Sequence, residues 1–564
     1  MDHQKIKEVL AMAKKTVAQL MVDTLKNEGV QYVFGIPGEE NIHFVDAIDK
    51  ADGIEFILTR HEQGAAFMAS VYGRLTNNAG VCTATLGPGA INLTLGVADA
   101  QTNSTPLVAI SAQGGLNRIH KESHQVIDLV SMFAPITQWS QMILSPQAVP
   151  EMVRKAFSLA ERDRPGATYL ALPQDIEKMT APEELQPLPI PPISVTEPTQ
   201  EDIAAAVDLI ASAKHPIILA GHGVVLKHAE SQLLAFSETF NIPVATTFMA
   251  KGAISDRNAH ALGVVGFMRH DYENYAFDQA DLIIAVGFSI QQFDPVKINP
   301  HGDKKILHIN MFREDPDTHY NTTLNIVANI PKSLERLTHA LAQENMHFPK
   351  IKLPIKKMLT TELEAHSTAT NFPMTPQRIV ADTRAAMKDD DIVLVDTGAV
   401  KMWMARLFPT YLSNTCLIDN GLSTMGWALP GAIGAKLAAP DRRVLAVMGD
   451  GSFMMNVQEI ETAVREHIHM VVLVWQDNAY GLIKWKMDMS LKHHSQVDFD
   501  NPNFVELARS FGAIGYQIEK SEDLLPTLKS ALDAAKGVHI ISVPVDYSEN
   551  MKLINRLGSL TIKL

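Results

Sequence analysis

The sequence predicts an α/β protein built from three doubly wound, parallel-sheet domains, and three observations lead to this prediction. A chain of 564 residues is too long for one core, since a domain holds roughly 150 residues. Two proline-containing segments, residues 181–198 and 345–374, divide the chain into three parts and are expected to be linkers. Each part alternates continuous apolar runs with amphipathic segments, a pattern typical of parallel strands covered by helices on both faces.

The predicted domains comprise residues 1–180, 199–344 and 375–548, and residues 549–564 are expected to form a C-terminal tail. The apolar runs include GVCTATLGPG in the first domain, HPIILAGHG and DLIIAVGF in the second, and RRVLAVMGDG and HMVVLVWQDN in the third. In doubly wound sheets, ligands bind beyond the carboxyl ends of the strands. The glycine-containing segments that follow these runs are therefore the expected edges of a site.

Composition and charge argue against several classes of protein. A hydrophobic content of 46% and a charged content of 20% are typical of soluble globular proteins. A net charge of −14 gives no support for nucleic-acid binding. The chain has no run of about eighteen apolar residues, and its charged N-terminal stretch does not resemble a signal peptide. We therefore expect a cytoplasmic protein that binds neither nucleic acid nor membranes, with Cys82 and Cys416 as buried thiols.

A metal site is predicted where two neighbouring strands of the third domain end. Gly-Asp-Gly at residues 449–451 follows one apolar run, and Asp477-Asn478 follows the next. A strand–helix–strand unit of this length brings both strand ends to the same edge of a parallel sheet. Two oxygen side chains and a nearby carbonyl suit Mg²⁺, and the glycines allow backbone amides to approach phosphate. The alternative is that Gly-Asp-Gly forms only a turn.

These residues resemble the fingerprint of thiamin diphosphate (ThDP) enzymes, in which Gly-Asp-Gly precedes a helix and an apolar strand ending in Asn. The resemblance implies that Asp450 and the strand-end residue bind Mg²⁺, with a backbone carbonyl two positions further on. Many members have Asn-Asn at the strand end, whereas this chain has Asp477-Asn478, so we take Asp477 as the ligand and Ala479 as the carbonyl donor. The resemblance then implies that the first domain binds the pyrimidine, the second is a Rossmann-like central domain, and the third binds the diphosphate. Further cofactor contacts implied in the third domain are Gly398, Ala399, Gly449, Gly451, Ser452, Tyr480 and Gly481.

The segment NGLSTMGWALPGAIGA, residues 420–435, resembles the part of these enzymes that bends the cofactor. By this resemblance, Met425 supports the V-shaped cofactor and the Ser423 carbonyl holds its 4′-amino group. The alternative for Met425 is plain core packing, which is common for methionine. The segment DTGAV, residues 396–400, would lie beside the diphosphate.

Glu62 has two possible roles. Thr59 to Glu62 fits a capping box at a helix N-terminus. RHEQGA also resembles the family segment whose glutamate shares a proton with N1′ of the aminopyrimidine, and Gly38 in GIPGE would contact the cofactor as well. In the family, the domains corresponding to the first and third meet across a subunit interface. The resemblance therefore implies a homodimer or homotetramer with active sites at that interface.

The whole chain resembles the acetohydroxyacid synthase group of acetolactate synthases, through YVFGIPGEEN, LTRHEQGAAFMA, TLGPGAINL and PVDYSEN. Gln125 matches the active-site glutamine of that group, and the alternative is an exposed helix residue. The reaction implied is the condensation of two pyruvates to 2-acetolactate and CO₂ through a ThDP carbanion and enamine. Residues 288–299, FSIQQFDPVKIN, are similar to the catabolic, FAD-independent branch, so FAD is not expected to be required. The Gly-x-Gly in AGHGVV, residues 220–225, could still hold a nucleotide.

Other functions stay open at this point. The chain could be another ThDP-dependent 2-keto acid carboligase or decarboxylase, or a pyruvate oxidase. It could also be a catalytically silent binding protein, since fold alone does not determine activity. A nicotinamide-dependent dehydrogenase is not expected, because no Gly-x-Gly-x-x-Gly follows an apolar run.

Overall fold

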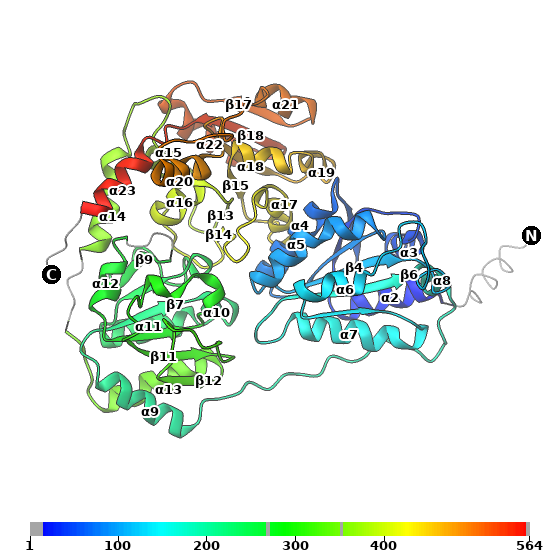
Figure 1. Cartoon of the computed structure of the whole chain (residues 1–564), viewed down its shortest axis with the longest axis horizontal. Helices are drawn as coiled ribbons and strands as arrows, with labels where there is room; N and C mark the ends of the chain where they lie inside the picture. The colour runs from blue at the N-terminus through cyan, green and yellow to red at the C-terminus, as the bar shows by residue number, and fades with distance from the viewer. Residues whose placement is uncertain (1–14, 267–270, 350–353, 560–564) are drawn as a thin grey trace, which may run out of the picture. The chain divides into compact units, whose positions relative to one another are not determined.

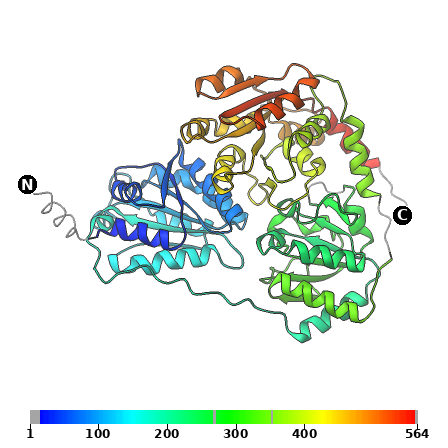
Figure 2. The same cartoon turned by 180° about the vertical axis from the view of Figure 1, so that it is seen from behind.

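Three parallel sheets, each of six strands, organise the chain (Figure 1). The computed structural model describes residues 15–266, 271–349 and 354–559. The chain divides into two compact units, unit 1 at residues 1–193 and unit 2 at residues 194–564. Unit 1 contains one sheet and unit 2 contains two, and helices pack against each sheet in both views (Figures 1 and 2). The predicted α/β class with three doubly wound parallel sheets is confirmed.

The sheet of unit 1 has the strand order β2-β1-β3-β4-β6-β5. Its central strands are buried along their whole length, as expected for apolar runs without alternation. The order reverses between β1 and β3, and doubly wound sheets bind ligands at such a reversal. The strands are β1 (Tyr32–Gly35), β2 (Glu55–Leu58), β3 (Gly80–Ala84), β4 (Leu107–Gln113), β5 (Trp139–Met142) and β6 (Ala167–Pro173). The helices are α2 (Val17–Asn27), α3 (Ile42–Asp49), α4 (Glu62–Thr76), α5 (Pro88–Thr102), α6 (Leu129–Phe133), α7 (Val149–Ala160) and α8 (Gln174–Lys178).

The first sheet of unit 2 has the order β12-β11-β10-β7-β8-β9, which is the 3-2-1-4-5-6 arrangement of Rossmann folds. Its strands are β7 (Pro216–Ala220), β8 (Val244–Thr246), β9 (Ala261–Val264), β10 (Leu282–Val286), β11 (Lys305–Asn310) and β12 (Leu324–Val327). Its helices are α9 (Gln200–Ala211), α10 (His222–Leu226), α11 (Glu230–Phe240), α12 (Asn274–Gln279) and α13 (Ile330–Gln343).

The Gly-x-Gly after β7 is explained by packing between strand ends. A Cβ atom on Gly221 would lie 2.4 Å from the carbonyl oxygen of Gly287, and one on Gly223 would lie 2.7 Å from the Cα atom of Gly287. Any side chain at these two positions would collide with the backbone that follows β10. The two glycines therefore need no nucleotide to account for them.

The second sheet of unit 2 repeats the strand order of unit 1, as β14-β13-β15-β16-β18-β17. Its strands are β13 (Ile392–Val395), β14 (Cys416–Ile418), β15 (Val444–Gly449), β16 (Met470–Gln476), β17 (Ile514–Gln517) and β18 (Val538–Pro544). Its helices are α15 (Pro376–Ala386), α16 (Ala399–Leu407), α17 (Ala428–Ala438), α18 (Asp450–Met455), α19 (Glu459–Arg465), α20 (Gly481–Leu491), α21 (Phe504–Ser510) and α22 (Leu524–Leu532). One apolar cluster runs through both sheets of unit 2, from Ile217 to Leu557. The expected burial of Cys82 and Cys416 is confirmed.

The segments expected as linkers and tail differ from one another. Residues 181–198 contain neither helix nor strand, as their prolines suggest. Residues 345–374 include α14 (Ile355–His366), and the tail includes α23 (Glu549–Ser559). Both helices pack into unit 2 through polar contacts that the sequence does not reveal.

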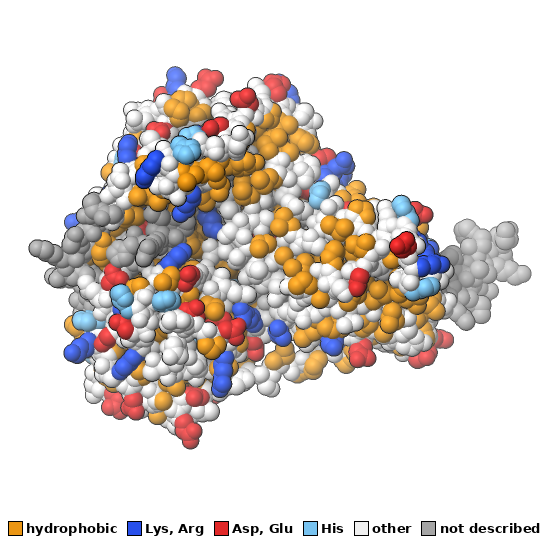
Figure 3. Space-filling view, viewed as in Figure 1, with side chains coloured by type: hydrophobic (Ala, Val, Ile, Leu, Met, Phe, Trp, Pro, Cys, Tyr) orange, Lys and Arg blue, Asp and Glu red, His pale blue; other side chains and the backbone are white. Residues whose placement is uncertain are grey.

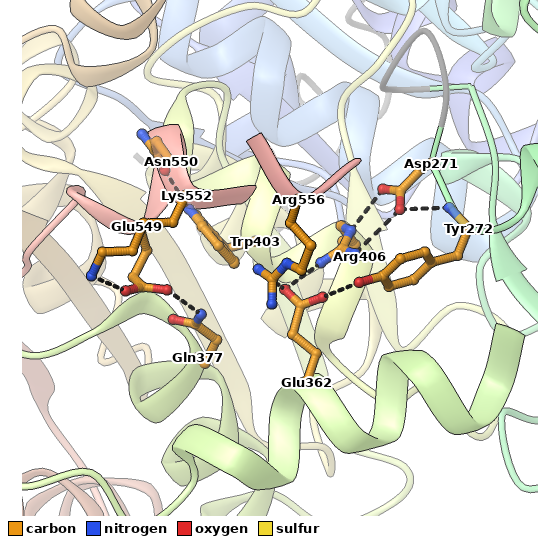
Figure 4. Close-up of polar contacts among 10 residues, drawn as sticks. All are labelled: Asp271, Tyr272, Glu362, Gln377, Trp403, Arg406, Glu549, Asn550, Lys552 and Arg556. Atoms are coloured by element: carbon orange, nitrogen blue, oxygen red, sulfur yellow. Dashed lines mark hydrogen bonds and ion pairs between the residues drawn. The ribbon is translucent and has the colours of Figure 1, made fainter. Parts of the chain in front are cut away.

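A buried ion-pair network joins these helices to the rest of unit 2 (Figure 4). The guanidinium group of Arg406, on α16, lies 2.6 Å from a carboxylate oxygen of Asp271 and 2.7 Å from one of Glu362, on α14. Glu362 also lies 3.3 Å from Arg556, on α23, and accepts a hydrogen bond from the Tyr272 hydroxyl at 3.2 Å. We call Asp271, Tyr272, Glu362, Arg406 and Arg556 the Arg406 network. Its opposite charges are in direct contact.

Candidate active site

A cavity lies at the carboxyl edge of the sheet formed by β13 to β18. The loops after β13, β15 and β16 line it, and the strand order reverses between β13 and β15, where doubly wound sheets bind ligands. We call this space the third-sheet cavity. The residues lining it that the sequence predicts for the cofactor or metal are Gly398, Ala399, Met425, Gly449, Asp450, Gly451, Ser452, Asp477, Ala479, Tyr480 and Gly481.

Asp450 connects the ends of β15 and β16. It is fully buried, and one carboxylate oxygen accepts a hydrogen bond from the Gly451 N–H at 2.8 Å. The other oxygen accepts hydrogen bonds from the N–H groups of Asp477 at 3.1 Å and Asn478 at 2.7 Å. The two strand ends therefore meet at one edge of the sheet, and they hold the Asp450 carboxylate in a fixed orientation.

Asp477 is a second carboxylate in the same cavity wall. Burial, together with repulsion from Asp450, raises the pKa of Asp477 to about 8. Burial also raises the pKa of Asp450, although the hydrogen bonds that it accepts oppose this shift. Lys484 favours the ionised form of Asp477, but its ammonium group also bonds to Asp498 at 2.7 Å. A divalent cation would offset the repulsion, and hard oxygen donors are those that Mg²⁺ prefers.

The neighbours of Asp477 fit this donor set. Ala479 is buried and lines the cavity, whereas Asn478 is absent from the cavity lining. The Asn478 side chain instead accepts a hydrogen bond from Asn501 at 2.7 Å. Within residues 15–266, 271–349 and 354–559, no three His, Cys, Asp or Glu side chains gather as a metal cluster. A metal in the third-sheet cavity would therefore depend on two carboxylates and a backbone carbonyl.

The four glycines of the cavity serve two purposes. A Cβ atom on Gly449 would meet nothing within 4 Å, and one on Gly398, where φ is +148°, would meet only Val400 at 3.9 Å. The backbone is thus open at these two positions, as approach by a phosphate requires. A Cβ atom on Gly451 would lie 2.8 Å from the ring of Tyr480, and one on Gly481 would lie 2.6 Å from an Asp477 carboxylate oxygen. These two glycines make room for neighbouring side chains.

Met425 lies in the cavity wall, on the segment between β14 and α17. Ser423 precedes it in a left-handed conformation, with φ at +58°, and does not itself line the cavity. The Lys401 ammonium group, on α16, donates hydrogen bonds to the Asp419 carbonyl at 2.6 Å and to the Ser423 hydroxyl at 3.0 Å. Met425 is therefore a partly buried cavity residue and not a member of the described apolar core.

Two polar residues of the site were not found from the sequence, in addition to the apolar lining residues Leu482 and Ile483. Asn501 donates a hydrogen bond to Asp450 at 2.8 Å, in addition to its bond to Asn478. Tyr547 lines the cavity, and burial followed by the charges of Asp477 and Asp450 raises the pKa of its hydroxyl. Asn501 lies in a polar loop without a recognisable pattern. Tyr547 lies in PVDYSEN, a segment that resembles the family, and this was the available signal.

Glu62 begins α4 in unit 1, and the alternative of a capping box at Thr59 is wrong. The N-cap is His61, whose imidazole accepts the N–H of Gln63 at 3.1 Å. The Thr59 hydroxyl instead bonds to the carbonyl of His61 at 3.2 Å. The Glu62 carboxylate is buried and accepts a hydrogen bond from Asn92, on α5, at 2.9 Å. Glu62 is thus held by a neighbouring helix, which local sequence does not indicate.

Gly38 and Glu62 lie at the carboxyl edge of the unit 1 sheet, joined through Thr85 and Gly89. A Cβ atom on Gly38 would lie 2.3 Å from the side chain of Thr85. A Cβ atom on Gly89 would lie 2.9 Å from Thr85 and 3.1 Å from a Glu62 carboxylate oxygen. The loops after β1 and β3 therefore pack against the start of α4.

Gln125 is exposed, but it lies in a turn with φ at +59° and not in a helix. Its carbonyl oxygen would lie 2.8 Å from a Cβ atom on Gly87, which caps the N-terminus of α5. The expectation of an exposed helix residue is therefore wrong about the helix. Gln125 is in contact with the loop that follows β3.

Models of one enzyme family match all three parts of the chain. The thiamine pyrophosphate (ThDP) enzyme N-terminal TPP binding domain matches residues 15–132, the central domain matches residues 203–337, and the C-terminal TPP binding domain matches residues 396–543.

Relatives match over nearly the full length. An acetolactate synthase of Bacillus subtilis is 34% identical over 97% of this chain and 96% of its own. A probable acetolactate synthase large subunit of Methanococcus aeolicus is 34% identical over 96% of this chain and 94% of its own. A catabolic acetolactate synthase of Raoultella terrigena is 33% identical over 96% of this chain and 97% of its own.

The described part of the chain contains no helix with the length and apolar character required to cross a membrane. The three matched domains, the full-length relatives and the cavity at the switch point agree with one another. The chain belongs to the thiamine pyrophosphate enzyme family.

Proposed function

We propose that this protein is an acetolactate synthase, which condenses two molecules of pyruvate to 2-acetolactate and CO₂. The observation that carries the proposal is a pair of carboxylates, the buried Asp450 and the partly buried Asp477, in a cavity at the switch point of a ThDP-enzyme sheet. Full-length relatives that are named acetolactate synthases support the choice of reaction within the family.

The third-sheet cavity would hold both cofactors. Mg²⁺ would bind the carboxylates of Asp450 and Asp477 and the carbonyl of Ala479. The diphosphate would lie against the open backbone at Gly398 and Gly449, with Ala399, Gly451, Ser452, Tyr480 and Gly481 completing the wall. ThDP, when bound, supplies the electron sink for carbon–carbon bond cleavage and formation. FAD would not be required.

The chain's own residues would orient and activate the cofactor. Met425 would support it from below, and the Ser423 carbonyl would accept a hydrogen bond from its 4′-amino group. Glu62 would exchange a proton with the aminopyrimidine, because a carboxyl group can act as both acid and base. Asn92 would keep the Glu62 carboxylate oriented through its hydrogen bond. Gly38 and the exposed Gln125 would complete the wall near the substrate.

We also propose that two copies of the chain complete each site, in a cytoplasmic homodimer or homotetramer. Asn92, the partner of Glu62, lies on α5 between Ile91 and Leu95, which are 46% and 38% exposed. Hydrophobic side chains gather over the visible face of unit 1 (Figure 3). Exposed apolar side chains favour protein contacts, and Ile91 and Leu95 lie on the same helix as Asn92, the partner of the proposed catalytic Glu62.

The test is an assay with pyruvate, ThDP and Mg²⁺ in the absence of FAD. The reaction is stopped with acid, which decarboxylates acetolactate to acetoin, and an unacidified sample is the control. We expect acid-dependent acetoin from the wild type. Glu62→Gln should remove turnover while folding and ThDP binding persist. Glu201→Gln, at an exposed glutamate in the first turn of α9, is the matched control and should behave as the wild type.

The same assay identifies the alternatives. ThDP binding without acetolactate would overturn the reaction and favour another ThDP-dependent carboligase or decarboxylase. Hydrogen peroxide formation that requires FAD would identify a pyruvate oxidase. Failure to bind ThDP would overturn the cofactor site itself.

A further inference from the structure

The segment that carries Met425 is clamped by two buried side chains. The N–H of Gly426 donates a hydrogen bond to a carboxylate oxygen of Asp396 at 3.0 Å, and the N–H of Ala428 donates to the other oxygen at 2.7 Å. The carbonyl of Gly426 accepts a hydrogen bond from the Asn456 side chain at 2.7 Å. Three consecutive peptide groups directly after Met425 are therefore fixed.

The two clamping residues adjoin other walls of the third-sheet cavity in the chain, although neither lines it. Asp396 is fully buried and directly precedes residues 397–400, which line the cavity. Asn456 is 1% exposed and directly follows α18, the helix that begins with Asp450. The Ser452 hydroxyl, on α18, also donates a hydrogen bond to the Thr397 carbonyl at 3.1 Å. The Met425 segment is thus bound both to the loop after β13 and to the helix that carries the metal carboxylate.

The backbone takes left-handed conformations on both sides of Met425. Ser423 and Gly426 both have left-handed conformations, with φ at +58° and +81°, and a left-handed conformation is unfavourable for residues other than glycine. A Cβ atom on Gly426 would lie 3.0 Å from both Asn456 and Met455, so the clamp also fills the space around this residue. Glycine permits the conformation at residue 426, and the hydrogen bonds from Gly426 and Ala428 to Asp396, with the one from Asn456, fix the path of the chain there.

We infer that Asp396 and Asn456 are positioning residues that hold Met425 at the cofactor and couple its position to that of Asp450. The inference rests on the proposed cofactor site and adds two residues to it. Neither side chain lines the cavity, so both act through the backbone of residues 425–428. The clamp would thus keep Met425 at a fixed distance from the α18 side of the cavity, where the diphosphate is proposed to bind.

Asp396→Asn tests the clamp without changing its size. Asparagine has one acceptor oxygen and one NH₂ group. The N–H of either Gly426 or Ala428 would therefore face the NH₂ group, which is a donor, and would lose its hydrogen bond. Loss of one hydrogen bond to a charged acceptor corresponds to about a 10- to 100-fold change in a rate constant, if the bond contributes fully to the transition state. We expect kcat to fall about 10- to 100-fold, while the variant still binds ThDP because Asp450, Asp477 and Ala479 are intact. The near-ultraviolet circular dichroism of the bound cofactor should also change.

Asp281→Asn is the matched control. The Asp281 carboxylate also accepts two backbone N–H groups, from Lys214 at 2.7 Å and His215 at 2.9 Å, but it lies next to β10 in the other sheet of unit 2. This variant should keep the wild-type kcat and cofactor spectrum. A second test, Asn456→Ala, removes the bond to the Gly426 carbonyl together with the bond that Asn456 accepts from the Gln458 side chain at 3.2 Å. It leaves both bonds to Asp396 in place and replaces Asp396→Asn should that variant fail to fold. It should change kcat and the spectrum in the same direction.

Both measurements are made on folded protein saturated with ThDP and Mg²⁺, with thermal unfolding recorded in parallel. Wild-type kcat and an unchanged cofactor spectrum in the folded variants would overturn the inference and leave only a structural role. If the wild type binds ThDP without forming acetolactate, the proposed reaction fails, and the spectrum of bound cofactor still decides the clamp. If the wild type does not bind ThDP, both proposals are overturned.

Discussion

Unit 2 contains two clusters of buried charge that differ in how the charge is compensated. In the Arg406 network, the positive charge of Arg406 is in direct contact with the carboxylates of Asp271 and Glu362 (Figure 4). Each of these buried charges therefore has a partner of opposite sign. In the third-sheet cavity, Asp450 and Asp477 repel each other, and burial raises the pKa of both. In the first cluster the compensating charges come from the chain itself, whereas in the second the proposed Mg²⁺ would supply them.

The difference distinguishes a structural cluster from a functional one. Burial alone would lower the pKa of Arg406, but the adjacent carboxylates hold it well above its usual value. Buried charges are costly unless they are paired, so the network depends on all its members. Two carboxylates that destabilise one another are retained where binding of a ligand relieves the repulsion. The comparison therefore predicts opposite responses to loss of charge in the two clusters.

The largest effect is expected from Arg406→Met. It leaves Asp271 and Glu362 buried without their main partner, and breaking a buried pair costs about 3–5 kcal/mol. Chemical denaturation of the apoprotein should show this loss in the free energy of unfolding. Arg257→Met, which breaks an exposed pair with Asp389, is the control and should have a much smaller effect. Equal stability of the two variants would mean that the network is not structural.

Asp450→Asn should have the opposite effect on the apoprotein and a large effect on function. Removing one negative charge relieves the repulsion at Asp477, so the melting temperature without metal should stay the same or rise. Substitution of a residue that contacts a metal ligand lowers activity by about 10- to 100-fold. Because Asp450 is itself a proposed ligand, activity should fall by about 100-fold, the upper end of this range. Calorimetry with Mg²⁺ and ThDP should show weakened binding. A strongly destabilised apoprotein with intact binding would contradict the comparison.

The pH dependence of stability should also separate the clusters. The pKa of Asp477 is about 8 in the folded protein and 3.8 when unperturbed, so between these values the folded state binds more protons than the unfolded state. The contribution of Asp477 to the free energy of unfolding of the apoprotein should therefore decrease as pH rises from about 4 to 8. Melting temperatures at pH 5 to 8 should show a steeper decrease in the wild type than in Asp477→Asn. Saturation with Mg²⁺ and ThDP should flatten the wild-type curve, and an unchanged slope would contradict the cation site.

The smallest effect is expected from Asn501→Ala. It removes one hydrogen bond to Asp450 but no proposed ligand, and loss of such an outer contact weakens metal binding by about 10-fold. Titration with Mg²⁺ in the presence of ThDP measures the change. Asn27→Ala, which removes a surface bond to the Leu188 carbonyl in unit 1, should leave Mg²⁺ affinity unaltered. An Asn501→Ala affinity equal to that of the wild type would remove this residue from the site.

The sequence by itself determined the class of fold and the place of the site. Continuous apolar runs that end in glycine specify buried parallel strands, because the spacing of hydrophobic residues and the residue preferences of turns are local properties of the sequence. The positions of Asp450 and Asp477 follow from those strands, since neighbouring parallel strands bring their carboxyl ends to one edge. The sequence therefore sufficed for the residues that directly follow strands.

Only the tertiary structure decided which distant side chains support those residues. Asn92 holds Glu62, and Asn501 holds Asp450, from helices and loops whose approach depends on packing of the whole unit. The same holds for Asp396 and Asn456, which meet at Gly426. The alternative of a capping box at Thr59 is wrong because that hydroxyl bonds to the carbonyls of His61 and of Gly35 on β1, and His61 caps the helix instead. Local pattern places a functional residue on its element, but its hydrogen-bond partners come from contacts between segments far apart in the chain.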